Sequence, residues 1–201
     1  MEWKAAKPYY SFGRLRNELL ACQGGIRHPT LHRRSCSQIE YFIECMPACV
    51  AASLIMDDHA LLQEALGEAR KGLRERGLPI GSVLADSQGR IVARGHNLRV
   101  QTGDPTAHAE TVCLRNAGRR RDWPELTLVS TLSPCIMCTG TALLYRIPRV
   151  IVGENQNFMG AEDLFRQHGV NLVVLDDADC IQIMREFIHA HSDLWYEDIG
   201  K

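Results

Sequence analysis

The chain has 201 residues, of which 45% are hydrophobic and 23% charged, and its formal net charge at pH 7 is −1. These values are typical of a globular domain and exclude a disordered, collagenous or repeat-built chain. The small net charge means that the chain lacks the broad positive field that drives non-specific nucleic-acid binding. The sequence also contains no run of about 18 apolar residues, the length needed to cross a bilayer. We therefore expect neither nucleic acid nor membrane as a partner.

The composition changes near residue 56. Residues 1–55 carry seven Lys or Arg and four Asp or Glu, a net charge of +3, which leaves −4 for residues 56–201. The four cysteines of this first segment match no standard metal-ligand spacing, so we predict free thiols rather than a metal site. Arg33 and Arg34 lie too far from the chain start and from the apolar stretch 45–56 to favour an export signal. We predict that 1–55 is a poorly organised extension, dispensable for catalysis, and that 56–201 is the catalytic domain of a reducing, cytoplasmic protein.

The second segment alternates between helical and strand patterns. Apolar residues from Leu62 to Leu73 share one helical stripe, and two apolar runs at 80–86 and 90–95, separated by Ser87-Gln88-Gly89, predict a hairpin. Farther along the chain we predict helices at 106–116, 134–145, 162–168 and 178–189, and strands at 126–132, 149–153 and 170–175. Strands separated by helices predict an α/β sandwich whose later strands run parallel.

The strongest motif is His108-Ala109-Glu110 followed by Pro134-Cys135-Ile136-Met137-Cys138. One histidine and two cysteines offer three zinc ligands and leave the fourth tetrahedral position open for water, as in catalytic zinc sites. Glu110 adds a carboxylate that can move protons, and the combination is the signature of zinc-dependent deaminases. A lone Cys-x-x-Cys pair is often structural or redox-active, but the four residues together predict a catalytic centre.

Helix geometry is consistent with this centre. Ser133 is a good N-cap and Pro134 suits the first helical position, which would place Cys135 and Cys138 on one face of the opening turns. Asp104-Pro105 similarly predicts the start of the helix that bears the histidine. Residues two apart on a helix do not face one another, so His108 and Glu110 can converge only off the helix N-terminus.

Other polar residues carry weaker signals. Five further histidines lack partner spacing, and we expect most of them at the surface: His59, His96, His168, His189 and His191. Arg119-Arg120-Arg121 could meet a phosphate, but Asp122 and Glu125 follow at once, so a solvated loop is the favoured interpretation.

From about Met56 to its end, the chain resembles the fungal-type zinc-dependent cytosine deaminases of the cytidine and cytosine deaminase superfamily. The zinc motif is shared by the whole superfamily, whereas the aromatic and acidic C-terminus is the narrower marker. The matching blocks are Leu78-Pro79-Ile80-Gly81, Arg94-Gly95-His96-Asn97, His108-Ala109-Glu110, Leu132-Ser133-Pro134-Cys135-Ile136-Met137-Cys138-Thr139-Gly140, Ile147-Pro148-Arg149, Val152-Gly153-Glu154-Asn155 and Trp195-Tyr196-Glu197-Asp198-Ile199-Gly200.

The resemblance implies a three-layer sandwich, a mixed five-stranded sheet with helices on both faces, and a homodimer that deaminates free cytosine with one zinc ion per subunit. Carried over by position, it assigns zinc binding to His108, Cys135 and Cys138, proton transfer to Glu110, and the base's polar edge to Asn97 and the backbone of Ala109. By the same resemblance, the carboxylate of Asp198 accepts a hydrogen bond from the exocyclic amine of the base, and the side chains of Phe158 and Trp195 cover its ring.

This chain departs from the fungal pattern at two positions in the motif. Ala109 replaces a glycine and is common in the superfamily, whereas Ile136 replaces an aspartate between the two cysteine ligands and can alter their surroundings. The fungal enzymes also lack the extension.

Zinc can lower the pKa of bound water to about 7, and Glu110 would shuttle protons during hydrolysis. Because aromatic side chains over a small base leave little room for a ribose, we expect the free base as substrate. The alternatives are deamination of guanine or another amino-heterocycle, a tRNA adenosine deaminase, and a non-catalytic zinc module. Glu110 argues against the last, because a structural zinc site has no use for a proton shuttle.

Overall fold

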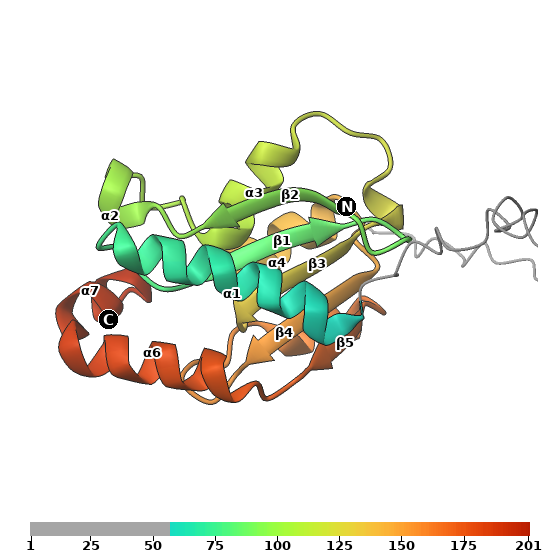
Figure 1. Ribbon diagram of the computed structural model, residues 1–201. Helices are drawn as coiled ribbons and strands as arrows, with labels where there is room; N and C mark the ends of the chain where they lie inside the picture. Colours follow the sequence, from blue (N-terminus) through green and yellow to red (C-terminus); the bar gives the residue numbers. More distant parts are fainter. Residues whose placement is uncertain (1–56) are drawn as a thin grey trace, which may run out of the picture. The chain divides into compact units, whose positions relative to one another are not determined.

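The structure is a computed structural model, and it describes residues 57–201 (Figure 1). The predictions for the extension, including its free thiols and the export signal, lie outside these residues. Within 57–201, no helix combines the length and apolar character needed to cross a membrane.

Helix α1 (Asp58–Arg74) begins the described region. Its N-cap is Asp57, whose carboxylate accepts a hydrogen bond of 2.8 Å from the Ala60 amide and so satisfies one free donor of the first turn. The apolar stripe predicted from the sequence packs against the sheet, with Leu62, Ala65 and Leu66 fully buried, but its last member, Leu73, is 40% exposed at the end of the helix. Burial of this stripe fixes which side of α1 faces the core.

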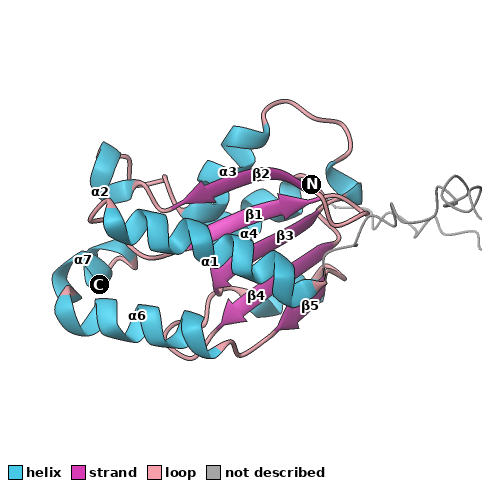
Figure 2. Cartoon of the chain, viewed as in Figure 1, coloured by secondary structure: helices cyan, strands magenta, loops and turns pink. Residues whose placement is uncertain are grey.

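Five strands form one mixed sheet in the order β2-β1-β3-β4-β5 (Figure 2). The predicted hairpin is β1 (Gly81–Ala85) and β2 (Ile91–His96), which pair antiparallel. β3 (Thr127–Leu132) runs antiparallel to β1 and parallel to β4 (Arg149–Glu154), and β5 (Asn171–Val174) runs parallel to β4. The predicted parallel direction of the later strands is therefore confirmed.

Helices cover both faces of this sheet (Figure 1). α1 and α6 (Ala178–Ala190) pack on one face around Val129 and Ile151. α3 (Ala109–Ala117), α4 (Ile136–Leu144) and α5 (Glu162–Gln167) lie on the other, around Leu128 and Phe165. The predicted three-layer α/β sandwich with a mixed five-stranded sheet is confirmed.

Three short elements were not predicted. They are α2 (Arg99–Thr102), a 3₁₀ helix at Trp123–Glu125, and α7 (Ser192–Asp198) at the C-terminus. α7 depends on long-range packing: its Trp195 is buried in a cluster with Leu78, Met184 and Phe187. Helices this short are unstable alone, so their own residues predict them poorly.

The helix that carries the histidine begins later than predicted. α3 starts at Ala109 with His108 as its N-cap, whereas Asp104-Pro105 was expected to begin it. The Asp104 carboxylate instead accepts hydrogen bonds from the amide (2.8 Å) and hydroxyl (2.7 Å) of Thr106. These bonds close a turn ahead of the helix.

The helix that carries the cysteines differs in the same way. α4 starts at Ile136, and its N-cap is Cys135 rather than Ser133. The Ser133 hydroxyl donates to Glu162 at 2.9 Å and so does not cap α4. Both site helices therefore begin beside the metal-ligand candidates, which agrees with the expectation that the site lies off the helix ends.

Candidate active site

Two helix N-termini meet at a group of three potential metal ligands. His108 is the N-cap of α3 and Cys135 that of α4, and Cys138 follows in the first turn of α4. One ligand atom from each residue lies within 4.8 Å of the others. His108 Nδ1 is 3.5 Å from Cys135 Sγ, and a tetrahedral zinc ion with ordinary bond lengths would separate a nitrogen and a sulfur by about 3.5 Å. Donor type and spacing therefore fit zinc.

The two cysteine side chains differ in pKa. The pKa of Cys135 falls to about 4, because its sulfur accepts hydrogen bonds from Cys138 and from His108. The pKa of Cys138 is raised, because its thiol donates to Cys135 and is buried near Glu110. A thiolate is the form that binds metal, and the positive ends of two helices favour it here.

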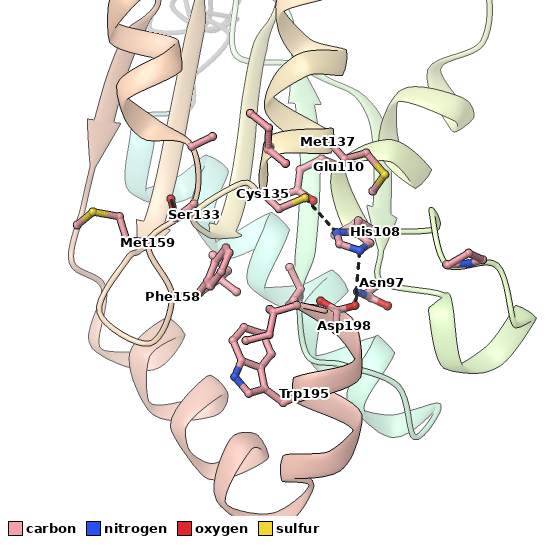
Figure 3. A pocket seen from close by; sticks show the side chains of 18 residues that line it. Asn97, His108, Glu110, Ser133, Cys135, Met137, Phe158, Met159, Trp195 and Asp198 are labelled. Atoms are coloured by element: carbon pink, nitrogen blue, oxygen red, sulfur yellow. Dashed lines mark hydrogen bonds and ion pairs between the residues drawn. The ribbon is translucent and has the colours of Figure 1, made fainter. Parts of the chain in front are cut away.

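His108 also faces a carboxylate. Its Nε2 lies 3.6 Å from Asp198 Oδ1. Burial would lower the pKa of His108, but the hydrogen bond to Cys135 and the charges of Asp198 and Cys135 outweigh burial and raise it. Figure 3 shows the imidazole between these two partners. The contacts orient the ring, with Nδ1 toward the cysteines.

Glu110 lies in the first turn of α3 and is buried. Its Oε1 accepts a 2.9 Å hydrogen bond from the hydroxyl of Ser130 in β3. Burial raises the pKa of Glu110, which brings the carboxylate closer to the range where it can both take and give a proton. Sequence analysis missed Ser130, although a polar residue within an apolar strand was a usable signal.

These groups open onto one cavity of about 470 Å³. His108, Glu110 and Cys135 line it, while Cys138 completes the ligand group from outside the lining. Its volume is in the range of small-molecule sites and exceeds that of a single base, so volume alone does not distinguish a base from a nucleoside. All five predicted base contacts line the same cavity: Asn97, Ala109, Phe158, Trp195 and Asp198.

Two aromatic rings stand opposite the metal-ligand group (Figure 3). Phe158 comes from the loop after β4 and Trp195 from α7, and their rings meet edge to face with centroids 5.8 Å apart. This arrangement is favourable for aromatic pairs. The two segments, remote in sequence, therefore build one apolar wall.

Asn97 and Asp198 form a polar network with Arg99. Asn97 Nδ2 donates to Asp198 Oδ1 at 3.2 Å, and its Oδ1 accepts from the Arg99 amide at 3.0 Å. The Arg99 guanidinium contacts Asp198 at 3.2 Å and Glu197 at 2.9 Å. Arg99, which sequence analysis missed, therefore joins α2 to the tail helix; nothing in its sequence surroundings indicated a partner about 100 residues away.

The expectation that most of the five further histidines lie at the surface is confirmed: His59, His168, His189 and His191 are exposed. The fifth, His96, is buried, with Nδ1 3.0 Å from Glu68 and Nε2 2.9 Å from Glu75. The carboxylates of Glu68 on α1 and of its C-cap residue, Glu75, satisfy both ring nitrogens, which is how a polar side chain is tolerated inside. Ile136 is 66% exposed at the cavity rim, so its side chain faces solvent rather than lying buried around the ligands.

The basic run at 119–121 lies in a solvated loop, as predicted. Arg119 and Arg121 are exposed, and Arg120 pairs with Asp122, with Nη2 2.6 Å from the carboxylate.

The known proteins similar to this chain include deaminases. Residues 55–154 match the family described as the cytidine and deoxycytidylate deaminase zinc-binding region. Cytosine deaminase of Candida albicans is 43% identical over 150 residues, covering 74% of this chain and 100% of that protein. A tRNA-specific adenosine deaminase of Streptococcus pyogenes serotype M18 is 40% identical over 138 residues, covering 63% of this chain and 86% of the relative. The solved structure of guanine deaminase from Nitrosomonas europaea has a TM-score of 0.58 at 20% identity, covering 67% of this chain and 85% of that one, and supports the fold alone.

Proposed function

The chain belongs to the cytidine and deoxycytidylate deaminase family of zinc-binding proteins, and on that premise we propose that it hydrolyses free cytosine to uracil and ammonia. One observation carries the proposal: buried Glu110, His108 and Cys135 line the same cavity as Asp198, and Cys138 completes the metal-ligand group beside it. A proton-transfer group, a metal group and an acceptor for an amine are thus brought together. Such an activity would serve pyrimidine salvage.

His108, Cys135 and Cys138 would hold one zinc ion per subunit. When bound there, zinc supplies an activated water by lowering the pKa of that water toward 7. Glu110 takes a proton from the attacking water and delivers it to the ring nitrogen, which makes C4 of cytosine more electrophilic. Glu110 then takes the second proton from the hydroxyl now on C4 and delivers it to the amine, which leaves as ammonia while the C4 carbonyl forms. The Ser130 hydroxyl holds the carboxylate in place between these transfers.

The remaining cavity residues would hold the base. The Ala109 amide lies in the first turn of α3, where an N–H group has no helical partner and is free to donate. Asn97 presents an amide whose orientation is set by Asp198 and Arg99. Asp198 accepts from the exocyclic amine, and the rings of Phe158 and Trp195 cover the base and exclude water.

The free base is favoured over tRNA by the tail helix. α7 lies at the cavity with Asp198, and its neighbouring Glu197 is exposed. Because Glu197 is paired with the Arg99 guanidinium at 2.9 Å, this arginine is not free to bind the phosphates of a nucleic acid beside the cavity. The Candida albicans relative, which this chain covers over its full length, is a cytosine deaminase, and this supports the same choice.

The deciding experiment measures ammonia release by the zinc-loaded chain from cytosine, cytidine, guanine and a tRNA in separate reactions. We expect fast release from cytosine. We expect Glu110→Gln to retain zinc but lose most activity, because glutamine keeps the bond from Ser130 but cannot carry the proton. Glu186→Gln, an exposed change on α6, is the matched control. Release from guanine or tRNA alone would overturn the substrate, and an active Glu110→Gln would overturn the mechanism.

We further propose that residues 1–55 are dispensable, since 150 residues of this chain cover the whole Candida relative. A chain starting at Met56 should retain activity; a folded but inactive product would contradict this. A reducing, cytoplasmic location is supported by the described cysteines, all four of which are free.

We also propose a homodimer, supported by an exposed stripe on α4. Ile136, Gly140 and Leu144 are spaced four apart on one face, and Leu144 is 74% exposed. Tyr145 extends this apolar surface. Apolar stripes of this kind mark association surfaces, and a second copy would bury it.

A further inference from the structure

The loop between β4 and α5 carries Phe158 and is held at both ends. At its start, the Glu154 carboxylate accepts from the amides of Gln156 (2.7 Å) and Asn157 (3.0 Å). At its end, the amide of Gly160 donates to the Ser133 hydroxyl at 3.1 Å. Phe158 and Met159 therefore span a short stretch between two fixed points.

The second fixed point is joined directly to the turn that carries the metal ligands. Ser133 immediately precedes Pro134 and Cys135, and the Ala161 amide donates to the Pro134 carbonyl at 3.0 Å. A Cβ at Gly160 would lie 2.0 Å from that carbonyl oxygen, so only glycine permits this approach. Ser133 lies on the side of Cys135 that faces the loop (Figure 3).

Glu162 orients the hydroxyl that makes this link. Its carboxylate is 2% exposed and accepts from the Ser133 hydroxyl at 2.9 Å and from Asn155 Nδ2 at 3.0 Å. Because the Ser133 proton points to Glu162, an oxygen lone pair is left for the Gly160 amide. A hydrogen bond to a charged acceptor is stronger than one between neutral groups. The carboxylate thus sets the direction of the hydroxyl.

We propose that Glu162 and Ser133 act together as positioning residues, holding Phe158 against the metal-ligand turn and so setting the affinity for the base. The inference rests on the proposed base deaminase function. It assigns no chemical step to either side chain: Glu162 acts through Ser133, Ser133 acts through Gly160, and the loop then presents the aromatic ring.

The test is the effect of Ser133→Ala on KM and kcat for cytosine, with zinc content and hydrogen exchange of residues 158–161 measured on the full chain. We expect KM to rise about tenfold, as for loss of one charge-assisted hydrogen bond, while kcat changes much less. Exchange at Gly160 and Ala161 should quicken, and zinc content should stay unchanged. Ser133→Thr, which retains the hydroxyl, should restore KM.

Three further variants separate this role from plain stability. Glu162→Leu should reproduce the KM effect without adding to that of Ser133→Ala, because both act through one bond. Arg166→Ala removes the 2.8 Å ion pair of Glu162 with a half-exposed arginine, together with the exposed pair to Asp163, but keeps the bond from Ser133 to Glu162, and it should leave KM unchanged. Ser82→Ala removes another buried hydroxyl, bonded to the Val129 carbonyl at 2.7 Å, and should lower stability alone.

Two results would overturn the inference: an unchanged KM in Ser133→Ala with stability lowered as in Ser82→Ala, or unchanged exchange at residues 158–161. Additive effects of Ser133→Ala and Glu162→Leu would also contradict it. If the wild-type chain released no ammonia from cytosine, the proposed function would fail, but exchange would still test the link. Should Ser133→Ala fail to fold, the comparison of Glu162→Leu with Arg166→Ala decides the question.

Discussion

Replacing Arg99 tests whether it positions the Asp198 carboxylate at the cavity. The guanidinium contacts two acidic residues of α7, and the Arg99 side chain is only 11% exposed. Arg99→Ala would leave the Asp198 carboxylate, which is 4% exposed, with the Asn97 amide as its hydrogen-bond donor and His108 Nε2 at 3.6 Å. A hydrogen bond to a charged partner contributes about 1.5–3 kcal/mol, whereas the exposed pair with Glu197 adds about 0–1 kcal/mol. At about 1.4 kcal/mol per factor of ten, kcat/KM for cytosine should fall about 10- to 100-fold.

The chain should remain folded, because Trp195 still anchors α7 in the core. The measurement is steady-state ammonia release alongside thermal unfolding. Arg115→Ala is the matched control: this arginine pairs with Asp104 at 3.3 Å but is 58% exposed, so its loss should leave kcat/KM unchanged. If Arg99→Ala kept kcat/KM within about twofold of wild type while Asp198→Ala lost activity, the argument that Arg99 positions the carboxylate would be refuted.

Three other outcomes follow from the structure. The hydrogen bond from His96 lowers the pKa of Glu75 below its ordinary 4.5. This contact therefore stabilises the folded chain above pH 4.5, and the stabilisation is lost as the pH falls through the lowered pKa. The difference in Tm between wild type and His96→Gln should shrink in acid, and a constant difference would contradict this expectation. Chelation of zinc should abolish ammonia release and lower Tm, and added zinc should restore both; full activity after verified metal removal would exclude zinc. In sedimentation, Leu144→Glu should yield monomers while Leu73→Glu, an exposed leucine on α1, should not; an unchanged mass for Leu144→Glu would refute the α4 interface.

Local patterns were sufficient for the order of the elements. Hydrophobic periodicity predicted the hairpin, the parallel strands and the long helices, because each of these elements buries a face that its own sequence displays. Helix starts were predicted less well. Asp104 and Ser133 have the chemistry of N-caps, yet their side chains bond to Thr106 and Glu162 instead. Capping propensity is a local preference, and competing partners override it.

The sequence alone determined which residues form the candidate metal-ligand group and the proposed proton-transfer group, because the identity and spacing of His108, Glu110, Cys135 and Cys138 predict both. What the tertiary structure decided is how the cavity is closed and supported. Ser130 reaches Glu110, Glu162 reaches Ser133, and Arg99 reaches Asp198, each by a contact between different elements. Such pairings depend on how the sheet and helices stack and leave no periodic trace in the chain, so only the folded molecule reveals them.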